Sequence, residues 1–141
     1  MKETTIEQAK KYIFNLVGYN KRVPLYVLTQ DSCSEISRLL GFWLYKKFPK
    51  LKIYIYKGVA RVRFHDLLII QENKVYVIDP TIWQFFKNKK SILIAEENSI
   101  KNALAATSRY YGGKWKLSEN VRECSRAEIK ELKDTIKKNI A

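Results

Sequence analysis

The sequence has few of the residues that bind metals or cross-link small proteins. Its 141 residues include two cysteines and one histidine. These cannot supply the four ligands of a structural zinc site, and neither cysteine lies in a Cys-x-x-Cys pair. No apolar stretch reaches the length of a transmembrane helix, and residues 1–11 contain no apolar signal core. We therefore expect no metal, no cofactor and no membrane span, and a cytoplasmic protein or one exported without such a signal.

Acidic residues are also scarce. There are 14 Asp and Glu against 27 Lys and Arg, which gives a net charge of +13. Such a charge attracts nucleic acids, anionic membranes or acidic proteins. The lysines are spread along the chain without a long basic block, and Lys, Ile, Asn and Tyr are enriched together, as a bias in base composition would produce. The charge alone therefore does not indicate a specific nucleic-acid site.

The apolar pattern predicts one α+β domain over residues 1–141. The chain is 46% hydrophobic and 13% aromatic, which is typical of a folded domain. Helical spacing predicts helices over 4–18, 33–48, 98–111 and 125–140, with a helical turn at 82–86. Alternation predicts strands over 51–56, 59–70 and 74–79, which form an antiparallel meander with turns at Gly58 and 71–73, and 92–95 could add a fourth strand. The second and third strands are apolar on both faces, so we expect them at the centre of the sheet.

Cys33 stands at the start of a predicted helix. Ser32 and Glu35 have the spacing of a capping box, which would make Cys33 the first helical residue. The positive field of a helix N-terminus favours a thiolate, the form that acts as a nucleophile. The alternative is that Cys33 is simply a small buried residue, as many intracellular cysteines are.

His65 and Asp79 lie on the second and third predicted strands. A three-residue loop at 71–73 would place them opposite each other on one face, whereas a two-residue loop would put them on different faces. We expect the helix that begins at Cys33 to pack on the face of His65, which would bring thiol, imidazole and carboxylate together, as in a thiol protease. Alternatively, His65 is an ordinary strand residue and Asp79, before Pro80, forms a turn.

Three segments carry a resemblance to a known family. They are Asp-Ser-Cys33-Ser-Glu-Ile-Ser, then Phe-His65-Asp-Leu-Leu-Ile-Ile, then Tyr-Val-Ile-Asp79-Pro-Thr-Ile-Trp-Gln-Phe, within residues 29–86. This order resembles the transglutaminase-like branch of the papain-like cysteine protease superfamily. The resemblance implies a papain-like core with the nucleophile-bearing helix packed across the sheet, and Cys33 as nucleophile, His65 as base and Asp79 as the residue that orients the base. Many relatives have a small residue before the His and a Trp soon after it; here Phe64 precedes it and no Trp follows.

The family includes peptidases, glutamine deamidases, cross-linking transglutaminases, peptide-processing enzymes and inactive relatives. We expect acyl transfer from an amide of a protein or peptide through a thioester on Cys33, with hydrolysis favoured because it needs only water. The backbone N–H of Cys33 or the amide of Gln30 would bind the oxyanion. The alternatives are an inactive papain-like domain that binds a protein, and a basic nucleic-acid-binding protein.

Three further residues are candidates for the substrate edge: Arg61, Arg63 and Trp83. An unbroken strand would place both arginines on the face of His65, where they would favour acidic substrates. The alternative is that both are ordinary solvated strand residues, because a bulge at Gly58 would change the register.

Overall fold

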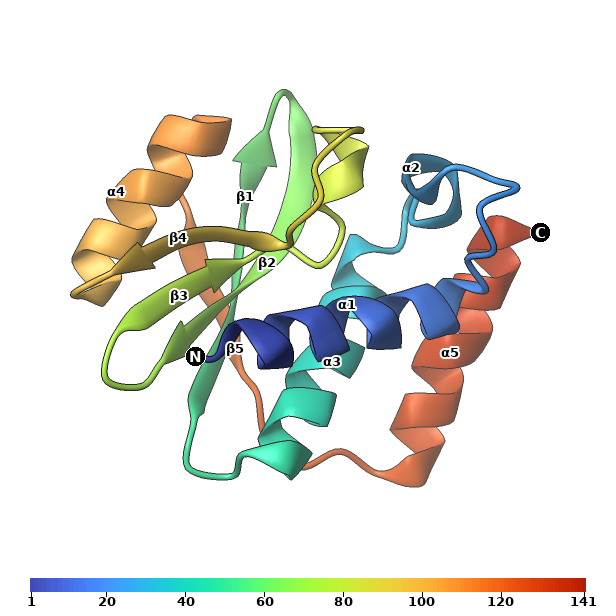
Figure 1. The fold of residues 1–141 in the computed structure, drawn as a ribbon, viewed down its shortest axis with the longest axis horizontal. Helices are drawn as coiled ribbons and strands as arrows, with labels where there is room; N and C mark the ends of the chain where they lie inside the picture. The colour runs from blue at the N-terminus through green and yellow to red at the C-terminus, as the bar shows by residue number, and fades with distance from the viewer.

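A computed structural model describes all 141 residues and contains a five-stranded antiparallel sheet and five α-helices (Figure 1). The expected α+β class with a central antiparallel sheet is confirmed. The strand order is β4-β3-β2-β1-β5, so β2 is central. No helix combines the length and the apolar character that crossing a membrane requires. The elements are α1 (Glu3–Val17), α2 (Leu25–Leu28), α3 (Cys33–Lys47), β1 (Lys52–Ala60), β2 (Arg63–Gln71), β3 (Val75–Ile78), the 3-10 turn η1 (Ile82–Gln84), β4 (Leu93–Glu97), α4 (Ile100–Tyr111), β5 (Lys116–Asn120) and α5 (Arg126–Ile140).

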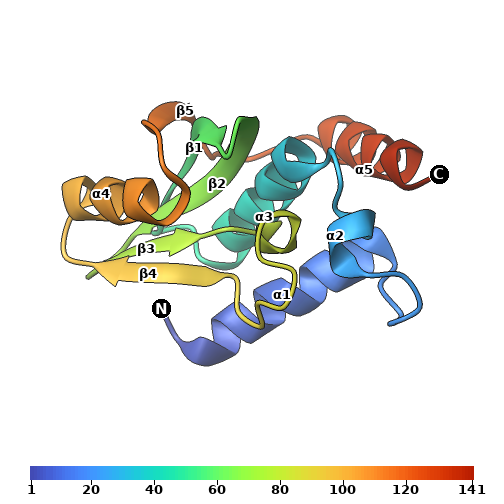
Figure 2. The same ribbon diagram turned by 90° about the horizontal axis from the view of Figure 1, so that it is seen from above.

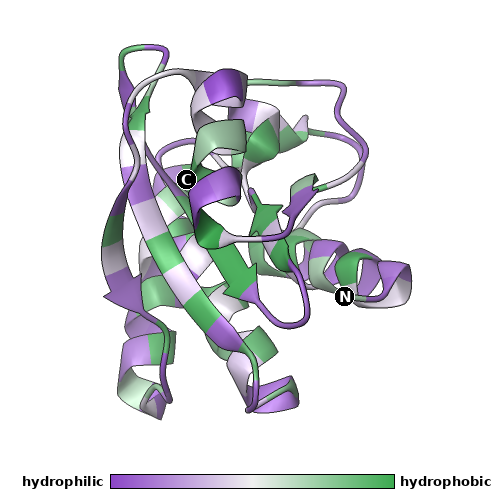
Figure 3. Ribbon diagram, turned by 90° about the vertical axis from the view of Figure 1, so that its left-hand side faces the viewer, coloured by the Kyte–Doolittle hydropathy of each residue, from purple (hydrophilic) through white to green (hydrophobic).

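Helices cover both faces of the sheet. Helices α1, α3 and α5 lie on one side and α4 lies on the other (Figure 2). Successive residues of β2 point to opposite faces, so Leu68 and Ile70 join the core under α1 and α3, while Leu67 and Ile69 join the core under α4. All four are fully buried, and Figure 3 shows hydrophobic colour on the inner strands. The prediction that β2 is buried on both faces is therefore confirmed.

The first hairpin turns later than predicted. Gly58 does not end a strand; β1 continues to Ala60, and Gly58 pairs with His65. The turn is made by Arg61 and Val62, which both have positive φ angles of 49° and 65°. Gly58 is required for close approach instead, because a Cβ there would lie 2.5 Å from the indole ring of Trp115.

The second hairpin has a different register from the predicted one. Gln71 pairs with Val75 and Leu68 pairs with Ile78, so the loop is 72–74 and the register is shifted by two residues. His65 is therefore not directly opposite Asp79, as predicted. A shift of two leaves every side chain on the same face. Asp79, which follows the last paired residue of β3, is therefore still on the side of His65.

Helix α3 packs on the other face from the predicted one. Its residues Ile36, Leu39 and Leu40 join the core that contains Leu68 and Ile70. The face of His65 is covered instead by α4 and by Trp115, which immediately precedes β5, a strand the sequence did not predict. The N-terminus of α3 nevertheless reaches β2, where the Ser37 hydroxyl donates to the carbonyl of Asp66 at 3.4 Å.

Candidate active site

His65 lies on the part of β2 that extends beyond the end of β3. Strand β3 pairs with β2 only from Leu68 to Gln71, so no strand flanks His65 on that side. The side chain is fully buried, and its Nε2 lies 2.7 Å from Oδ2 of Asp79. The imidazole and the carboxylate are therefore brought together by the part of β2 that β3 does not pair with and by the segment that follows β3.

Asp79 is held by hydrogen bonds at both carboxylate oxygens. Oδ1 accepts from the backbone N–H of Thr81 at 3.0 Å, and Oδ2 accepts from the hydroxyl of Tyr111 as well as contacting His65. The backbone N–H of Asp79 donates to the carbonyl of Ile92 at 2.9 Å. The carboxylate is fully buried, so these bonds replace its lost hydration and fix its orientation.

The electrostatics of the pair favour a protonated imidazole. Burial alone would lower the pKa of His65, but the charge of Asp79 and its hydrogen bond, with a smaller contribution from Cys33, raise the pKa of His65 to about 10. Burial and the adjacent Asp79 raise the pKa of Tyr111 far above its ordinary value. Tyr111 therefore stays a neutral hydrogen-bond donor, while His65 carries the positive charge that balances the buried carboxylate.

Cys33 is the first residue of α3 and lies near His65. Its side chain is half-buried, and the nearby thiol adds a smaller upward contribution to the pKa of His65. Because Nε2 faces Asp79, Nδ1 is the ring nitrogen left to face the sulfur. Nδ1 is buried and has no hydrogen-bond partner in the structure. The structure thus pairs His65 with Asp79 and places Cys33 near them, at the start of α3.

The loop before Cys33 is fixed by the C-terminal helix. Asp31 has a positive φ of 61°, and the side-chain amide of Asn139 in α5 donates to the carbonyl of Asp31 at 3.1 Å and to the hydroxyl of Ser32 at 3.0 Å. The predicted capping box is wrong, because the Ser32 hydroxyl makes no cap and instead donates to the carbonyl of Gln30 at 3.4 Å. The first-turn N–H groups of α3 therefore remain uncapped by this side chain.

The predicted oxyanion residue Gln30 and the two predicted substrate-edge arginines are all exposed, but they lie on different parts of the chain. Gln30 is exposed in the turn between α2 and α3. Arg61 is in the hairpin turn and not on a strand face; its guanidinium donates to the carbonyl of Phe85 at 3.4 Å and lies 4.8 Å from the ring centroid of Phe86. Arg63 is exposed at the start of β2.

Trp83 does not lie at a substrate edge, contrary to the prediction. It is 2% exposed and belongs to the main core, with its ring centroid 6.0 Å from that of Phe14. Its indole N–H donates to the carbonyl of Lys89 at 2.9 Å. A tryptophan suits this core position, because its ring packs among apolar side chains while its N–H donates to one backbone carbonyl.

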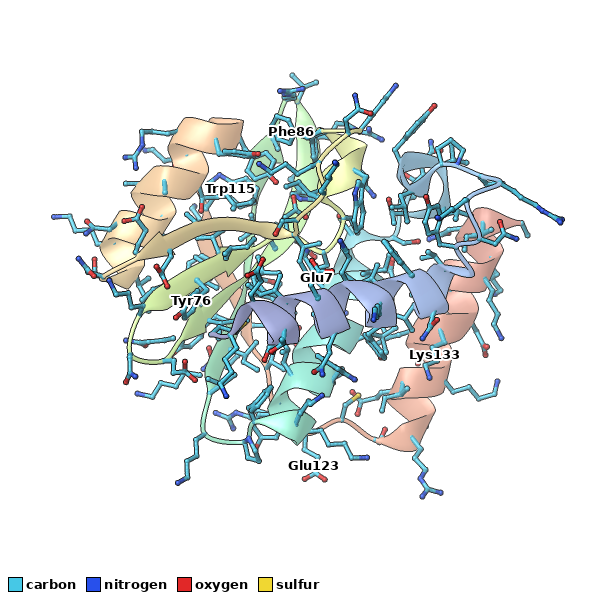
Figure 4. All side chains as sticks on the ribbon, viewed as in Figure 1. Glu7, Tyr76, Phe86, Trp115, Glu123 and Lys133 are labelled. Atoms are coloured by element: carbon cyan, nitrogen blue, oxygen red, sulfur yellow. The ribbon has the colours of Figure 1, made fainter.

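Three aromatic residues around His65 were not predicted from the sequence. The rings of Phe85 and Trp115 stand nearly perpendicular to the imidazole, at 4.7 and 6.2 Å between centroids, and the ring of Tyr111 lies at 5.6 Å. Trp115 comes from the segment before β5, and it and Phe86, both labelled in Figure 4, lie on either side of Tyr111 at 5.6 and 5.8 Å between ring centroids. The aromatic residues gathered at 110–115, together with those at 83–86, are the sequence signal for this surrounding of His65.

Such a row of thiol, imidazole and carboxylate can move a proton between sulfur and ring while the carboxylate holds the charge and the ring orientation. Cys33 is the one of these three residues that is not fully buried. Comparisons of the chain with models of protein families, with curated proteins and with solved structures found no match.

Proposed function

We propose that this protein is a cysteine-dependent amide hydrolase or acyltransferase of the transglutaminase-like, papain-like type that acts on a protein or peptide. Cys33 is the nucleophile, His65 the acid and base, and Asp79 the residue that orients and charges the imidazole. The observation that carries the proposal is the buried His65, whose Nε2 is bound to Asp79 and whose Nδ1 has no hydrogen-bond partner and is therefore available to the nearby Cys33 thiol.

The resting site is an ion pair in this proposal. Asp79 keeps His65 protonated at neutral pH, as the raised pKa of His65 requires. A positive imidazolium beside the sulfur attracts a thiolate, and so does the N-terminal end of α3. Both stabilise the negative charge on the sulfur as Cys33 attacks the substrate.

The reaction then proceeds in two acyl-transfer steps. The Cys33 thiolate attacks the carbonyl carbon of an amide, and the oxyanion accepts hydrogen bonds from the N–H of Cys33 and the exposed amide of Gln30. The C–N bond breaks as Nδ1 of His65 gives its proton to the leaving amine, which leaves a thioester on Cys33. Water then gives a proton to Nδ1 of His65 as its oxygen attacks the thioester carbonyl; the C–S bond breaks, the carboxylic acid product leaves, and the Cys33 thiolate and the protonated His65 are regenerated.

The surroundings support hydrolysis over cross-linking. Phe85, Tyr111 and Trp115 enclose the imidazole, whereas Cys33 is partly open to solvent. Water therefore needs no channel of its own to reach a thioester. If the released nitrogen belongs to a backbone amide, the reaction is proteolysis; if it belongs to a glutamine side chain, the reaction is deamidation.

The test is mass spectrometry of a denatured protein mixture and a glutamine-containing peptide set incubated with the enzyme. We expect new peptide termini or glutamine converted to glutamate, and incorporation of an added primary amine at a lower rate. Cys33→Ala and Asp79→Asn should lose this turnover, while Cys124→Ala should retain it. The proposal fails if products are absent from the wild type, or if Cys33→Ala forms them at the wild-type rate; the first result would favour an inactive protein-binding domain.

A further inference from the structure

The tip of the β1–β2 hairpin exposes apolar side chains that the fold does not use. Val62 is 96% exposed and Phe64 is 79% exposed, and Val59, which pairs directly with Phe64, is 44% exposed. Leu117 on the neighbouring strand β5 is 53% exposed. Large apolar side chains gathered at one end of a sheet indicate a contact surface more strongly than scattered ones do.

The turn itself has an unfavourable sequence for its backbone. Arg61 and Val62 both have positive φ angles, the conformation of a two-residue turn that Asn-Gly fits best. A β-branched residue is strained there. Val62 gains no burial in return, since it is almost fully exposed. Neither turn geometry nor folding therefore accounts for a valine at the apex.

Basic residues surround these apolar side chains. A groove of about 410 Å³ lies between the hairpin and β5, and its lining includes three lysines and no acidic residue. The nearest carboxylate on β2, Asp66, has a side chain only 5% exposed and is paired with Lys57 at 3.8 Å. The exposed cations of this end of the sheet are Lys57, Arg61, Arg63, Lys114 and Lys116.

We propose that the hairpin tip and β5 dock on an anionic lipid membrane surface. The apolar side chains Val59, Val62, Phe64 and Leu117 enter the boundary between headgroups and acyl chains, and the surrounding cations contact the anionic headgroups. Three of the four apolar residues are aliphatic, which suits acyl chains and provides little surface for stacking nucleic-acid bases. The tip projects from the body of the molecule (Figure 1), as a surface that meets a bilayer must.

Docking in this way is compatible with the proposed reaction but does not depend on it. Phe64 and His65 are adjacent on β2 and so point to opposite faces. Phe64 is exposed, whereas His65 is buried with Asp79. Substitution of Phe64 or Val62 therefore removes apolar surface without touching the candidate active site.

The test is co-sedimentation of the full chain with phosphatidylcholine vesicles, with and without phosphatidylserine, at low salt. We expect binding only with phosphatidylserine. Val62→Ser with Phe64→Ser should lower the partition constant at least about tenfold. Val23→Ser with Val27→Ser is the matched control, since those valines are 39% and 41% exposed elsewhere, and it should bind like the wild type. Thermal unfolding verifies that both double variants fold.

A second pair of variants separates local charge from net charge. Each basic residue at an anionic surface changes the partition constant about fivefold, so Lys114→Gln with Lys116→Gln should weaken binding about 25-fold. Lys137→Gln with Lys138→Gln removes the same charge from the end of α5, away from the hairpin (Figure 1), and should change binding less than about twofold.

Three results would overturn the proposal. The first is no binding to phosphatidylserine vesicles, including the case in which the hairpin residues instead bind an acidic peptide or single-stranded RNA. The second is an equal loss with both lysine pairs, which would reflect net charge alone. The third is unchanged binding of the Val62 and Phe64 double variant.

Discussion

Replacement of Gly58 by alanine should force the indole of Trp115 away from His65. The added Cβ would lie 2.5, 2.8 and 2.8 Å from three atoms of the ring, nearly 1 Å inside ordinary contact at 3.4 Å. Such overpacking costs about 1–3 kcal/mol. The lower entropy of alanine in the unfolded chain offsets about 0.5–1 kcal/mol of this cost. The free energy of unfolding should therefore fall by up to about 2.5 kcal/mol, as measured by urea denaturation followed by far-UV circular dichroism.

The matched experiment is Gly58→Ala in a Trp115→Ala background. Without the ring, the Cβ has space, so the same substitution should be neutral or stabilising by about 0.5–1 kcal/mol. The difference between the two changes in unfolding free energy then measures the clash between the Cβ and the indole ring. If Gly58→Ala costs the same in both backgrounds, the glycine is not required by Trp115 and the reasoning is refuted.

Tyr111→Phe removes a hydroxyl that donates to the buried Asp79, and it should lower the free energy of unfolding by about 1.5–3 kcal/mol in urea; a change below about 0.5 kcal/mol would contradict this role. The raised pKa of His65 means that its stabilising contribution is complete below its ordinary value of 6.5 and is lost as pH rises towards 10. The stability difference between wild type and His65→Gln should therefore shrink from pH 6.5 to 10, and a constant difference would contradict the pKa. Ser125→Ala removes the cap that accepts from the N–H of Glu128 and should cost about 1 kcal/mol by thermal or urea unfolding, against no loss if the cap is unimportant.

Local patterns predicted the parts of the fold that local forces determine. Apolar spacing gave the long helices within a few residues. The Ser125 and Ser99 caps of α5 and α4 are formed by residues within one turn, so they follow from the local sequence. The Ser32 cap failed because Asn139, 107 residues away, takes that hydroxyl. A tertiary contact of this kind leaves no mark in the local sequence.

Positions fixed by close packing were not predicted. Gly58 indicated a break, although it lies within β1 because Trp115 packs on it. The turn at Arg61 and Val62 has none of the usual turn residues. Strand β5 was missed because Lys116–Asn120 is an exposed edge strand with little apolar alternation. The prediction that His65 and Asp79 lie on the same face of the sheet is correct although the register is wrong, because a shift of two residues leaves each side chain on its face.

The proposal of an activated thiol is tested most directly by the rates at which iodoacetamide modifies the two cysteines of the native protein at neutral pH, followed by peptide mass spectrometry. Cys124 is the internal control. Burial, and then its hydrogen bond to Glu128, raise the pKa of Cys124 from 9.0 to about 11, so at neutral pH its thiolate fraction is about a hundredfold lower than that of an ordinary cysteine. We predict that Cys33 reacts faster than Cys124, and that His65→Ala slows Cys33 without affecting Cys124. Equal rates for the two cysteines, or an unreactive Cys33, would contradict the account.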